Sequence, residues 1–223
     1  MTDPAPARTP PDDPRTVASR RVGAAARALI GALVSSKAPI EELDGAAAAI
    51  DAINARLAPY RVHSRFEGFE GLAMPAPGSE LRDRIFEHHP FAGRSNPLAP
   101  PLVMEDADDG TVVATVTYDH RHEGMPDRVH GGVLAAAFDL ITAAAAARAA
   151  GRPAPTGRLT IRYRIPTPLH VGLRYEGRLE RIDGRKILTV ATVSADGVVT
   201  AEAEGLFIAA RTETLPRVGT ADA

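Results

Sequence analysis

The sequence predicts an α+β domain in which an antiparallel sheet wraps around one long central helix. After Gly132 the chain runs eighteen residues to Ala150 with only two charges, Asp139 and Arg148, and with no proline or glycine. Two strand-like segments precede this stretch, the second of them rich in β-branched residues, and four strand-like segments follow it. A helix that is apolar on all sides needs cover, so we expect the strands to enclose it.

The long helix is rich in alanine, the strongest helix former, and Gly151-Arg152-Pro153 is expected to end it. A membrane span is the competing interpretation. Alanine is only weakly apolar, and an aspartate at the middle of a span costs about 2.5–3.5 kcal/mol on insertion scales. We therefore favour a helix buried in a protein core.

Six strands are predicted from β-branched and alternating segments. Asp183-Gly184 and Asp196-Gly197 suit tight hairpin turns, and Asp108-Asp109-Gly110 suits the turn of the first hairpin. The expected strands are Leu102–Asp106, Thr111–Tyr118, Arg158–Pro166, Leu173–Ile182, Ile187–Ser194 and Val198–Ala209.

The N-terminal part has a different composition. Residues 1–14 hold five prolines and are expected to form a disordered lead to a helical extension over 15–80. Within it, Thr16–Val34 and a segment from Pro39 to Pro59 predict two helices that can pair as a hairpin. A packing appendage, a lid and a dimerisation element are all open, and packing is favoured. The main domain is expected over 90–210, with a loose tail over 211–223.

Composition excludes several classes of function. The chain has 223 residues, 44% of them hydrophobic, with a formal net charge of −2, so no global basic field recruits nucleic acid. It contains no cysteine, which excludes a thiolate nucleophile, a disulfide and a cysteine-ligated metal. The N-terminus lacks an apolar leader, so we expect a cytoplasmic protein.

The start of the long helix, His130-Gly131-Gly132, is suited to binding a developing negative charge. The N–H groups of a first helical turn have no intrahelical partner, and the helix dipole adds partial positive charge there. Glycines allow a ligand to approach the backbone closely. We therefore expect an oxyanion or a polarised carbonyl to bind at this turn.

Asp139 is the second candidate, because a carboxylate in an apolar helix is costly unless it is paired or functional. It lies nine residues beyond His130, which is ~13 Å along the axis and half a turn around it. Gly131 and Asp139 of one protomer therefore cannot meet on one small reacting group. If both act, a second copy supplies Asp139, most simply in a two-fold dimer with antiparallel helices.

Two further clusters leave alternatives open. Arg158, Arg162 and Arg164 line one face of a predicted strand and suit the phosphates of a large ligand, although a solvated strand face is the simpler interpretation. A zinc site is conceivable from histidines, but solvent-exposed side chains are favoured because no spacing supports a metal. These histidines are His88, His89, His120 and His122.

These features together resemble the hotdog fold, and specifically the PaaI-like acyl-CoA thioesterases that include the human THEM-type members. The resemblance rests on His130-Gly131-Gly132, on Asp139 nine residues later, and on Thr156 after the helix. The strand ending in Pro166-Thr167-Pro168-Leu169 and the loop from Pro90-Phe91 to Pro100-Pro101 also match. It covers residues 90–210.

The resemblance implies roles for individual residues. In such enzymes the N–H matching Gly131 polarises the thioester carbonyl, His130 and Gly132 shape that site, and the partner subunit's Asp139 acts as general base or nucleophile. Thr156 would orient the water. CoA binds at a dimer interface, with Arg158 and Arg162 as candidates for its phosphates, and no metal or cofactor is used.

One departure from the family lies before the glycines. Relatives often carry asparagine or a similar polar residue on that loop, whereas this chain has Arg121–Arg128, in which Glu123 or Asp127 could substitute. The sequence thus predicts a homodimeric or homotetrameric acyl-CoA thioesterase. The alternatives are a non-catalytic protein that binds acyl-CoA or an aromatic ligand, and a hotdog hydratase or dehydratase.

Overall fold

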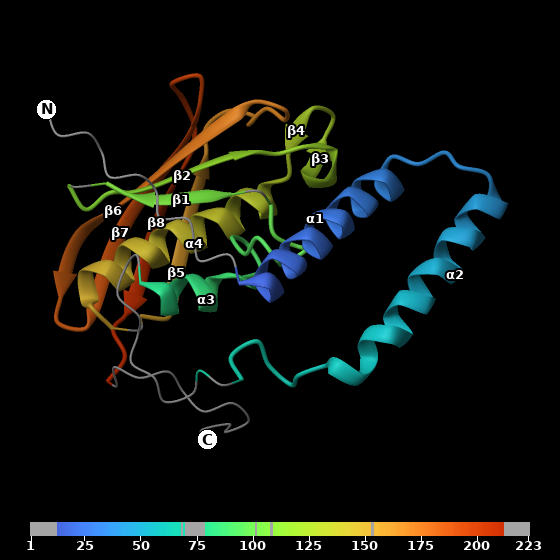
Figure 1. Cartoon of the computed structure of the whole chain (residues 1–223). Coiled ribbons are helices and arrows are strands. Elements are labelled where there is room, and N and C mark those ends of the chain that lie inside the picture. Colours follow the sequence, from blue (N-terminus) through green and yellow to red (C-terminus); the bar gives the residue numbers. More distant parts are fainter. Residues whose placement is uncertain are drawn as a thin grey trace, which may run out of the picture.

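The fold is an antiparallel sheet curved around one helix, with a helical extension at its side (Figure 1). The computed structural model describes residues 13–67, 69, 79–100, 102–107, 109–152 and 154–211. Most of the predicted lead, part of the irregular stretch before residue 79, and the tail beyond 211 lie outside these residues.

The sheet has six strands in the order β1-β2-β6-β7-β8-β5, and every neighbouring pair is antiparallel. The predicted fold class is therefore confirmed. Each predicted strand is present with ends shifted by no more than three residues. The strands are β1 (Val103–Asp106), β2 (Val112–Thr117), β5 (Thr156–Tyr163), β6 (Gly172–Asp183), β7 (Lys186–Ala195) and β8 (Val198–Ile208).

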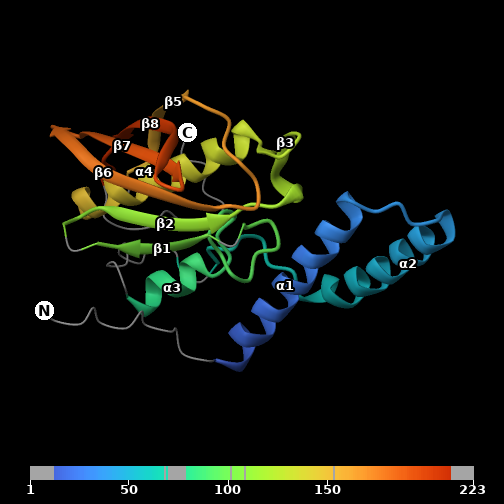
Figure 2. The ribbon, with the colours of Figure 1, turned by 90° about the horizontal axis from the view of Figure 1, so that it is seen from above.

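Helix α4 (Gly131–Ala150) occupies the concave side of the sheet (Figures 1 and 2). It ends where predicted, since Gly151 takes the left-handed conformation, with φ 62°, and donates its N–H to Ala147 O. The helix is long and apolar enough to cross a membrane by length and composition. Because Phe138 and Ile141 are fully buried against the sheet, it is the core helix of this domain.

The core forms between α4 and the inward positions of the strands. Alternation along β7 buries Ile187, Thr189, Ala191, Val193 and Ala195. The ring of Phe138 meets that of Tyr175 edge to face, with centroids 5.4 Å apart. Gly177 is needed where Ile141 crosses β6, because a Cβ there would lie 2.5 Å from Ile141 Cγ2.

A small second sheet leads into α4. It pairs β3 (Glu123–Met125) with β4 (Arg128–Val129), after the 3-10 turn η2 (His120–His122). Neither strand was predicted, because two or three residues are too short to show alternation. Val129 N donates to Thr167 O, so the Pro166–Leu169 segment fixes the approach to His130.

The N-terminal extension contains α1 (Pro14–Val34), α2 (Ile40–Leu57), a 3-10 turn η1 (Ala58–Tyr60) and α3 (Glu80–Phe86). The predicted helical region is confirmed, but α1 and α2 diverge as an open V and do not pack along their length (Figures 1 and 2). Helix α1 lies against η2, whereas α2 buries no residue.

Candidate active site

The first turn of α4 presents an unused backbone donor. His130 is the N-cap, and its Nδ1 accepts a hydrogen bond from Gly132 N–H at 3.0 Å. Within the described part of the chain, Gly131 N–H has no acceptor. This donor stands at the positive end of the α4 dipole, as an oxyanion site requires.

The hydrogen bond from Gly132 N–H to His130 Nδ1 also determines the tautomer of the neutral His130 ring. Since Nδ1 accepts from Gly132 N–H, the neutral ring carries its hydrogen on Nε2. His130 is exposed, and its backbone N–H donates to His122 O at 2.8 Å. The predicted candidates His130, Gly131 and Gly132 therefore form one structural unit at the helix start.

Tyr163 supports this turn from the edge strand β5. Its hydroxyl donates to Gly131 O at 2.9 Å, and a Cβ on Gly131 would lie 3.4 Å from the tyrosine ring. The sequence did not single out Tyr163 as a candidate. Its partner is a backbone carbonyl, which leaves no signal in the sequence.

Asp139 of α4 and Thr156 of β5 lie in direct contact within one protomer. Thr156 Oγ1 donates to Asp139 Oδ1 at 2.8 Å, while none of the described residues donates to Oδ2. Asp139 is half-buried and forms no ion pair with Arg148, which binds Asp106 at 3.0 Å. One carboxylate oxygen is thus held and the other remains available.

A β-bulge aims Thr156 at the helix. Thr156 pairs with Phe207 and Arg158 with Leu206, so Gly157 is an extra residue without a partner. Without the bulge, Thr156 and Leu159 would face opposite sides of the sheet, because side chains alternate along a strand. With it, both face α4.

His89 is a further residue near Asp139. Its ring stacks on Phe86 with centroids 5.0 Å apart, and its Nδ1 accepts from Phe91 N–H at 3.2 Å. The pKa of His89 is lowered to about 4, chiefly by burial and also by the positive charge of Arg65, while the negative charge of Asp139 opposes both. The loop that begins at His88 therefore contributes to the surroundings of Asp139.

The favoured interpretation of the histidines as solvent-exposed is wrong for three of them. His89 is half-buried, His120 Nε2 hydrogen-bonds Gly31 O at 2.9 Å, and the His122 ring lies 5.0 Å from that of Tyr118. In the described ranges, no group of three or more acidic or histidine side chains gathers as a metal site.

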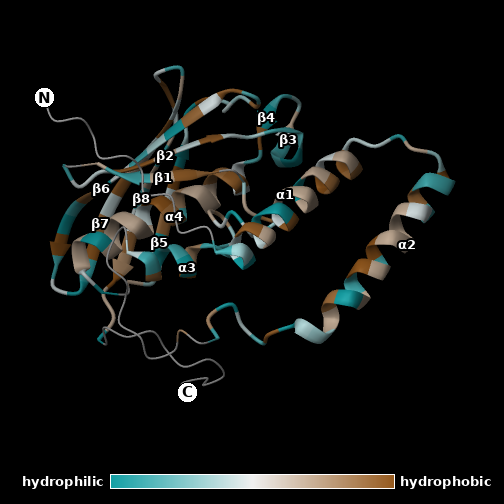
Figure 3. Ribbon diagram, viewed as in Figure 1, coloured by the Kyte–Doolittle hydropathy of each residue, from teal (hydrophilic) through white to brown (hydrophobic). Residues whose placement is uncertain are grey.

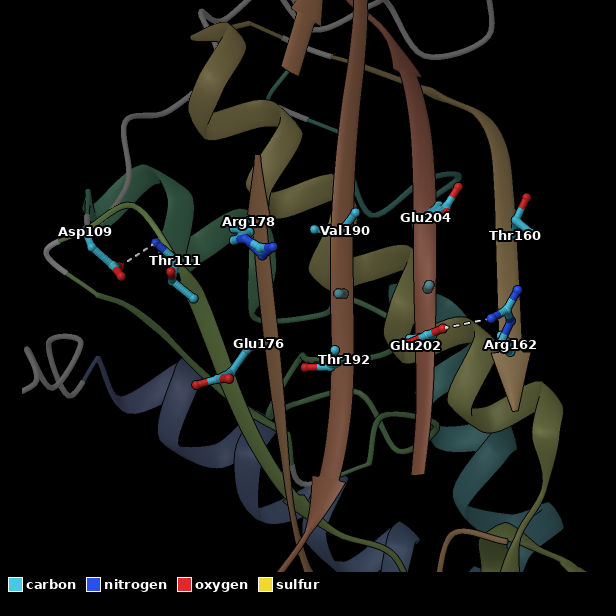
Figure 4. A pocket seen from close by; sticks show the side chains of 12 residues that line it. Asp109, Thr111, Thr160, Arg162, Glu176, Arg178, Val190, Thr192, Glu202 and Glu204 are labelled. Carbon is cyan, nitrogen blue, oxygen red and sulfur yellow. Dashed lines mark hydrogen bonds and ion pairs between the residues drawn. The ribbon is translucent and has the colours of Figure 1, made fainter. Parts of the chain in front are cut away.

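The remaining predicted residues lie elsewhere. Arg162 projects from the outer face of the sheet, opposite α4, into a shallow groove where it approaches Glu202 at 3.8 Å (Figure 4). Arg158 pairs in register with Leu206 and shares that face. The structure thus does not bring either arginine to the α4 start of the same protomer, and their role remains a prediction.

Glu123, in the loop before His130, has a structural role in that loop. Its Oε1 accepts from Asp127 N–H at 2.7 Å, in a turn where Asp127 has φ 58°. Both side chains are exposed. Glu123 therefore stabilises the β3–β4 turn, which places His130.

Comparison with known proteins gives a consistent family. Residues 127–202 match a family model described as the thioesterase superfamily. A crystal structure of a thioesterase superfamily protein is 32% identical, covers 90% of this chain and 97% of its own, and superposes with a TM-score of 0.73. This chain belongs to the thioesterase superfamily.

Curated relatives in the superfamily include acyl-coenzyme A thioesterase THEM4 of Xenopus laevis, which is 35% identical over 88 residues. The mouse protein of the same name is 33% identical over 88 residues. The aligned segment covers 39% of this chain and 39% of the Xenopus protein, or 37% of the mouse protein. The match to these relatives is therefore confined to part of each chain.

Proposed function

We propose that the protein is an acyl-CoA thioesterase, which hydrolyses R–CO–S–CoA and water to a carboxylic acid and CoA-SH. The hydrogen bond from Thr156 to Asp139 carries this proposal, because it holds a carboxylate in a fixed orientation with one oxygen free. The free Gly131 N–H and the similarity to THEM4 proteins support the same reaction.

The two halves of this site belong to different protomers. Strand β5 contacts Asp139 through Thr156 at its start and Gly131 through Tyr163 at its end. β5 is an edge strand whose outer side is unpaired, with Tyr163 52% exposed. If two β5 strands pair antiparallel about a two-fold axis, the start of one lies beside the end of the other. This pairing brings the partner subunit's Asp139 toward Gly131.

Catalysis then follows from charge placement. Gly131 N–H donates to the thioester oxygen and stabilises the oxyanion as the carbonyl carbon becomes tetrahedral, a contribution of about 2.7–4 kcal/mol for one such donor. The partner subunit's Asp139 takes a proton from the attacking water, a step that general bases accelerate by roughly 10²–10⁴-fold. Collapse of the intermediate breaks the C–S bond and releases CoA.

Asp139 as nucleophile is the second route. Its free oxygen would attack the carbonyl carbon, break the C–S bond with departure of the CoA thiolate, and form a mixed anhydride, which water then cleaves. A single turnover in H₂¹⁸O tests for the anhydride. Its cleavage at the aspartyl carbonyl leaves ¹⁸O in the protein, whereas direct attack by water, or cleavage of the anhydride at the acyl carbonyl, leaves ¹⁸O only in the product acid.

Thiol release from a panel of short, long and aromatic acyl-CoAs tests the reaction, with wild type and Asp139→Asn compared side by side. The proposal expects release by the wild type that falls at least a hundredfold in the variant. CoA esters that bind without release by the wild type would instead indicate a non-catalytic binding protein.

A further inference from the structure

Helix α1 has its polar side toward its own domain and its apolar side outward. Arg20 pairs with Glu87 at 2.7 Å, and Arg27 donates to Asn96 O at 2.9 Å. A Cβ on Gly23 would lie 2.8 Å from Ser95 O, so the helix backbone is in close contact there. The contacts named here that attach α1 are thus hydrogen bonds, the Arg20–Glu87 ion pair and the close approach at Gly23, whereas Val22, Leu29 and Leu33 are exposed.

The exposed apolar side chains of α1 form a stripe along the helix. Val22, Leu29 and Leu33 recur at i, i+7 and i+11, with exposures of 60%, 38% and 42%. They lie nearly opposite the face that holds Arg20 and Arg27, since residues advance by about 100° each. Figure 3 shows apolar segments along both α1 and α2.

Helix α2 carries a matching stripe. Leu43, Ile50 and Leu57 recur every seven residues, and Ile53 takes the intermediate position of a heptad. Leu43, Ile53 and Leu57 are 42%, 53% and 54% exposed, and none of α2 is buried. A heptad stripe suits packing against another helix rather than a loop or a flat surface.

The charges of the two helices are complementary. Helix α1 contains four arginines and no acid, and two of these arginines, Arg15 and Arg21, are not among those described above as attaching it to its own domain. Helix α2 contains four acids and one arginine. None of the ion pairs among the described residues uses an acid of α2. Acidic side chains also disfavour an anionic lipid surface, so the basic, apolar α1 is the better match for α2.

We propose that α2 of one protomer packs on the outward stripe of the partner subunit's α1, so that the extensions of two copies exchange α2. The open V leaves α2 away from its own domain (Figure 2), and a two-fold axis would satisfy both exchanged contacts at once. The 32% identical crystal structure covers 90% of this chain, so its match extends into the helical extension. This inference does not depend on the reaction catalysed.

Disulfide crosslinking tests the exchange directly, because the chain has no cysteine of its own. Two differently tagged versions are co-expressed, one with Leu29→Cys in α1 and the other with Ile53→Cys in α2, then oxidised. Val22→Cys and Leu57→Cys extend the scan to other registers. We expect a covalent dimer carrying both tags in at least one pair. Ala48→Cys, on the polar side of α2, is the matched control and should give at least tenfold less.

Two outcomes would overturn the proposal. One is the absence of a mixed crosslink in every register. The other is a double variant, Leu29→Cys with Ile53→Cys, that crosslinks within one chain when diluted with excess wild type, since α2 would then fold back on its own α1.

A charge variant gives an independent readout. Ile53 is exposed within the protomer, so Ile53→Glu leaves the core intact. By sedimentation we expect it to raise the dissociation constant of the dimer at least tenfold, whereas Ala52→Glu on the polar side should not. Equal dissociation constants for the two variants would contradict the exchange.

Discussion

The hydroxyl of Thr156 donates to one oxygen of Asp139 at 2.8 Å and connects the edge strand to the middle of the core helix. The two residues are seventeen positions apart in the chain, and the bulge at Gly157 makes their contact possible. This contact orients the Asp139 carboxylate through Oδ1, and none of the described residues donates to Oδ2.

Thr156→Val should therefore lower turnover without unfolding the protein. Valine keeps the shape of threonine but cannot donate, so Asp139 loses the hydrogen bond that orients it. We expect kcat for the best acyl-CoA to fall about 10–100-fold with little change in KM. Thr160→Val, on the outer face of the same strand, is the control, and equal loss in both variants would contradict a role for the hydroxyl.

Tyr163→Phe should loosen the first turn of α4, where we propose that the thioester carbonyl binds. Only the hydroxyl that donates to Gly131 O is removed, and the ring that packs on the glycine remains. We expect kcat to fall several-fold, with stability reduced by about 0.5–1.5 kcal/mol, the range for one hydrogen bond. Steady-state kinetics and thermal unfolding measure both, and unchanged kcat would show that this contact is structural only.

Gly124→Ala should displace His130. A Cβ at this position would lie 2.8 Å from His130 Cα, closer than real Cβ contacts allow. We expect a loss of about 1–3 kcal/mol in stability, as for other overpacked sites, together with reduced turnover. Gly172→Ala is the matched control because nothing lies within 4 Å of its Cβ. Wild-type activity in Gly124→Ala would mean that His130 can move without consequence.

Stability should fall on acidification partly through His89. Burial lowers its pKa to about 4 in the folded protein, against 6.5 in the unfolded chain. Between these values the unfolded chain binds a proton that the folded protein does not, so stability decreases as the pH falls from 6.5 to 4. Burial also lowers the pKa of His122 and adds to this slope.

His89→Gln removes one of these groups, so its unfolding temperature should change less between pH 6.5 and 4 than that of wild type. Below pH 4 a different group acts, because hydrogen bonds from Arg121 lower the pKa of Asp119 to about 2. Parallel curves for wild type and His89→Gln between pH 6.5 and 4 would contradict the burial of a neutral imidazole.

The sequence predicts most of the fold because its signals are local. Alanine-rich helix α4 ends at Gly151, and Asp196-Gly197 has positive φ at both residues, as its hairpin turn requires. The positions of His130 at the start of α4 and of Asp139 within it could also be predicted from the sequence, because both follow from the position of a residue along one helix. The separation of Gly131 from Asp139 follows from helix geometry alone.

Other features depend on contacts that no local pattern encodes. The bulge at Gly157 arises from register with β8, and Tyr163 acts on a backbone carbonyl. His89 is buried by Phe86 and Phe91, which the sequence does not distinguish from exposed loop residues. Periodicity showed that α2 has an apolar stripe, but it could not show that the stripe lies outside the protomer.

Subunit complementation tests most directly the proposal that Gly131 of one protomer and Asp139 of the partner subunit form one active site. One protomer carries Asp139→Asn and the other Gly131→Pro, which removes the N–H donor. Proline is tolerated at the first helical position, and His130 at ψ 133° has the extended backbone that suits a residue before proline. Gly131→Ala, which keeps the N–H, should retain more activity than Gly131→Pro.

The two variants are co-expressed with different tags, and the mixed dimer is purified. If the partner subunit supplies Asp139, one of the two sites in the mixed dimer has both an intact Gly131 and an intact Asp139. Thioesterase activity of the mixed dimer should then recover to about half that of wild type, while both parent homodimers stay inactive. If Gly131 and Asp139 act within one protomer, each site carries a lesion. A mixed dimer no more active than its parents would therefore contradict the shared site.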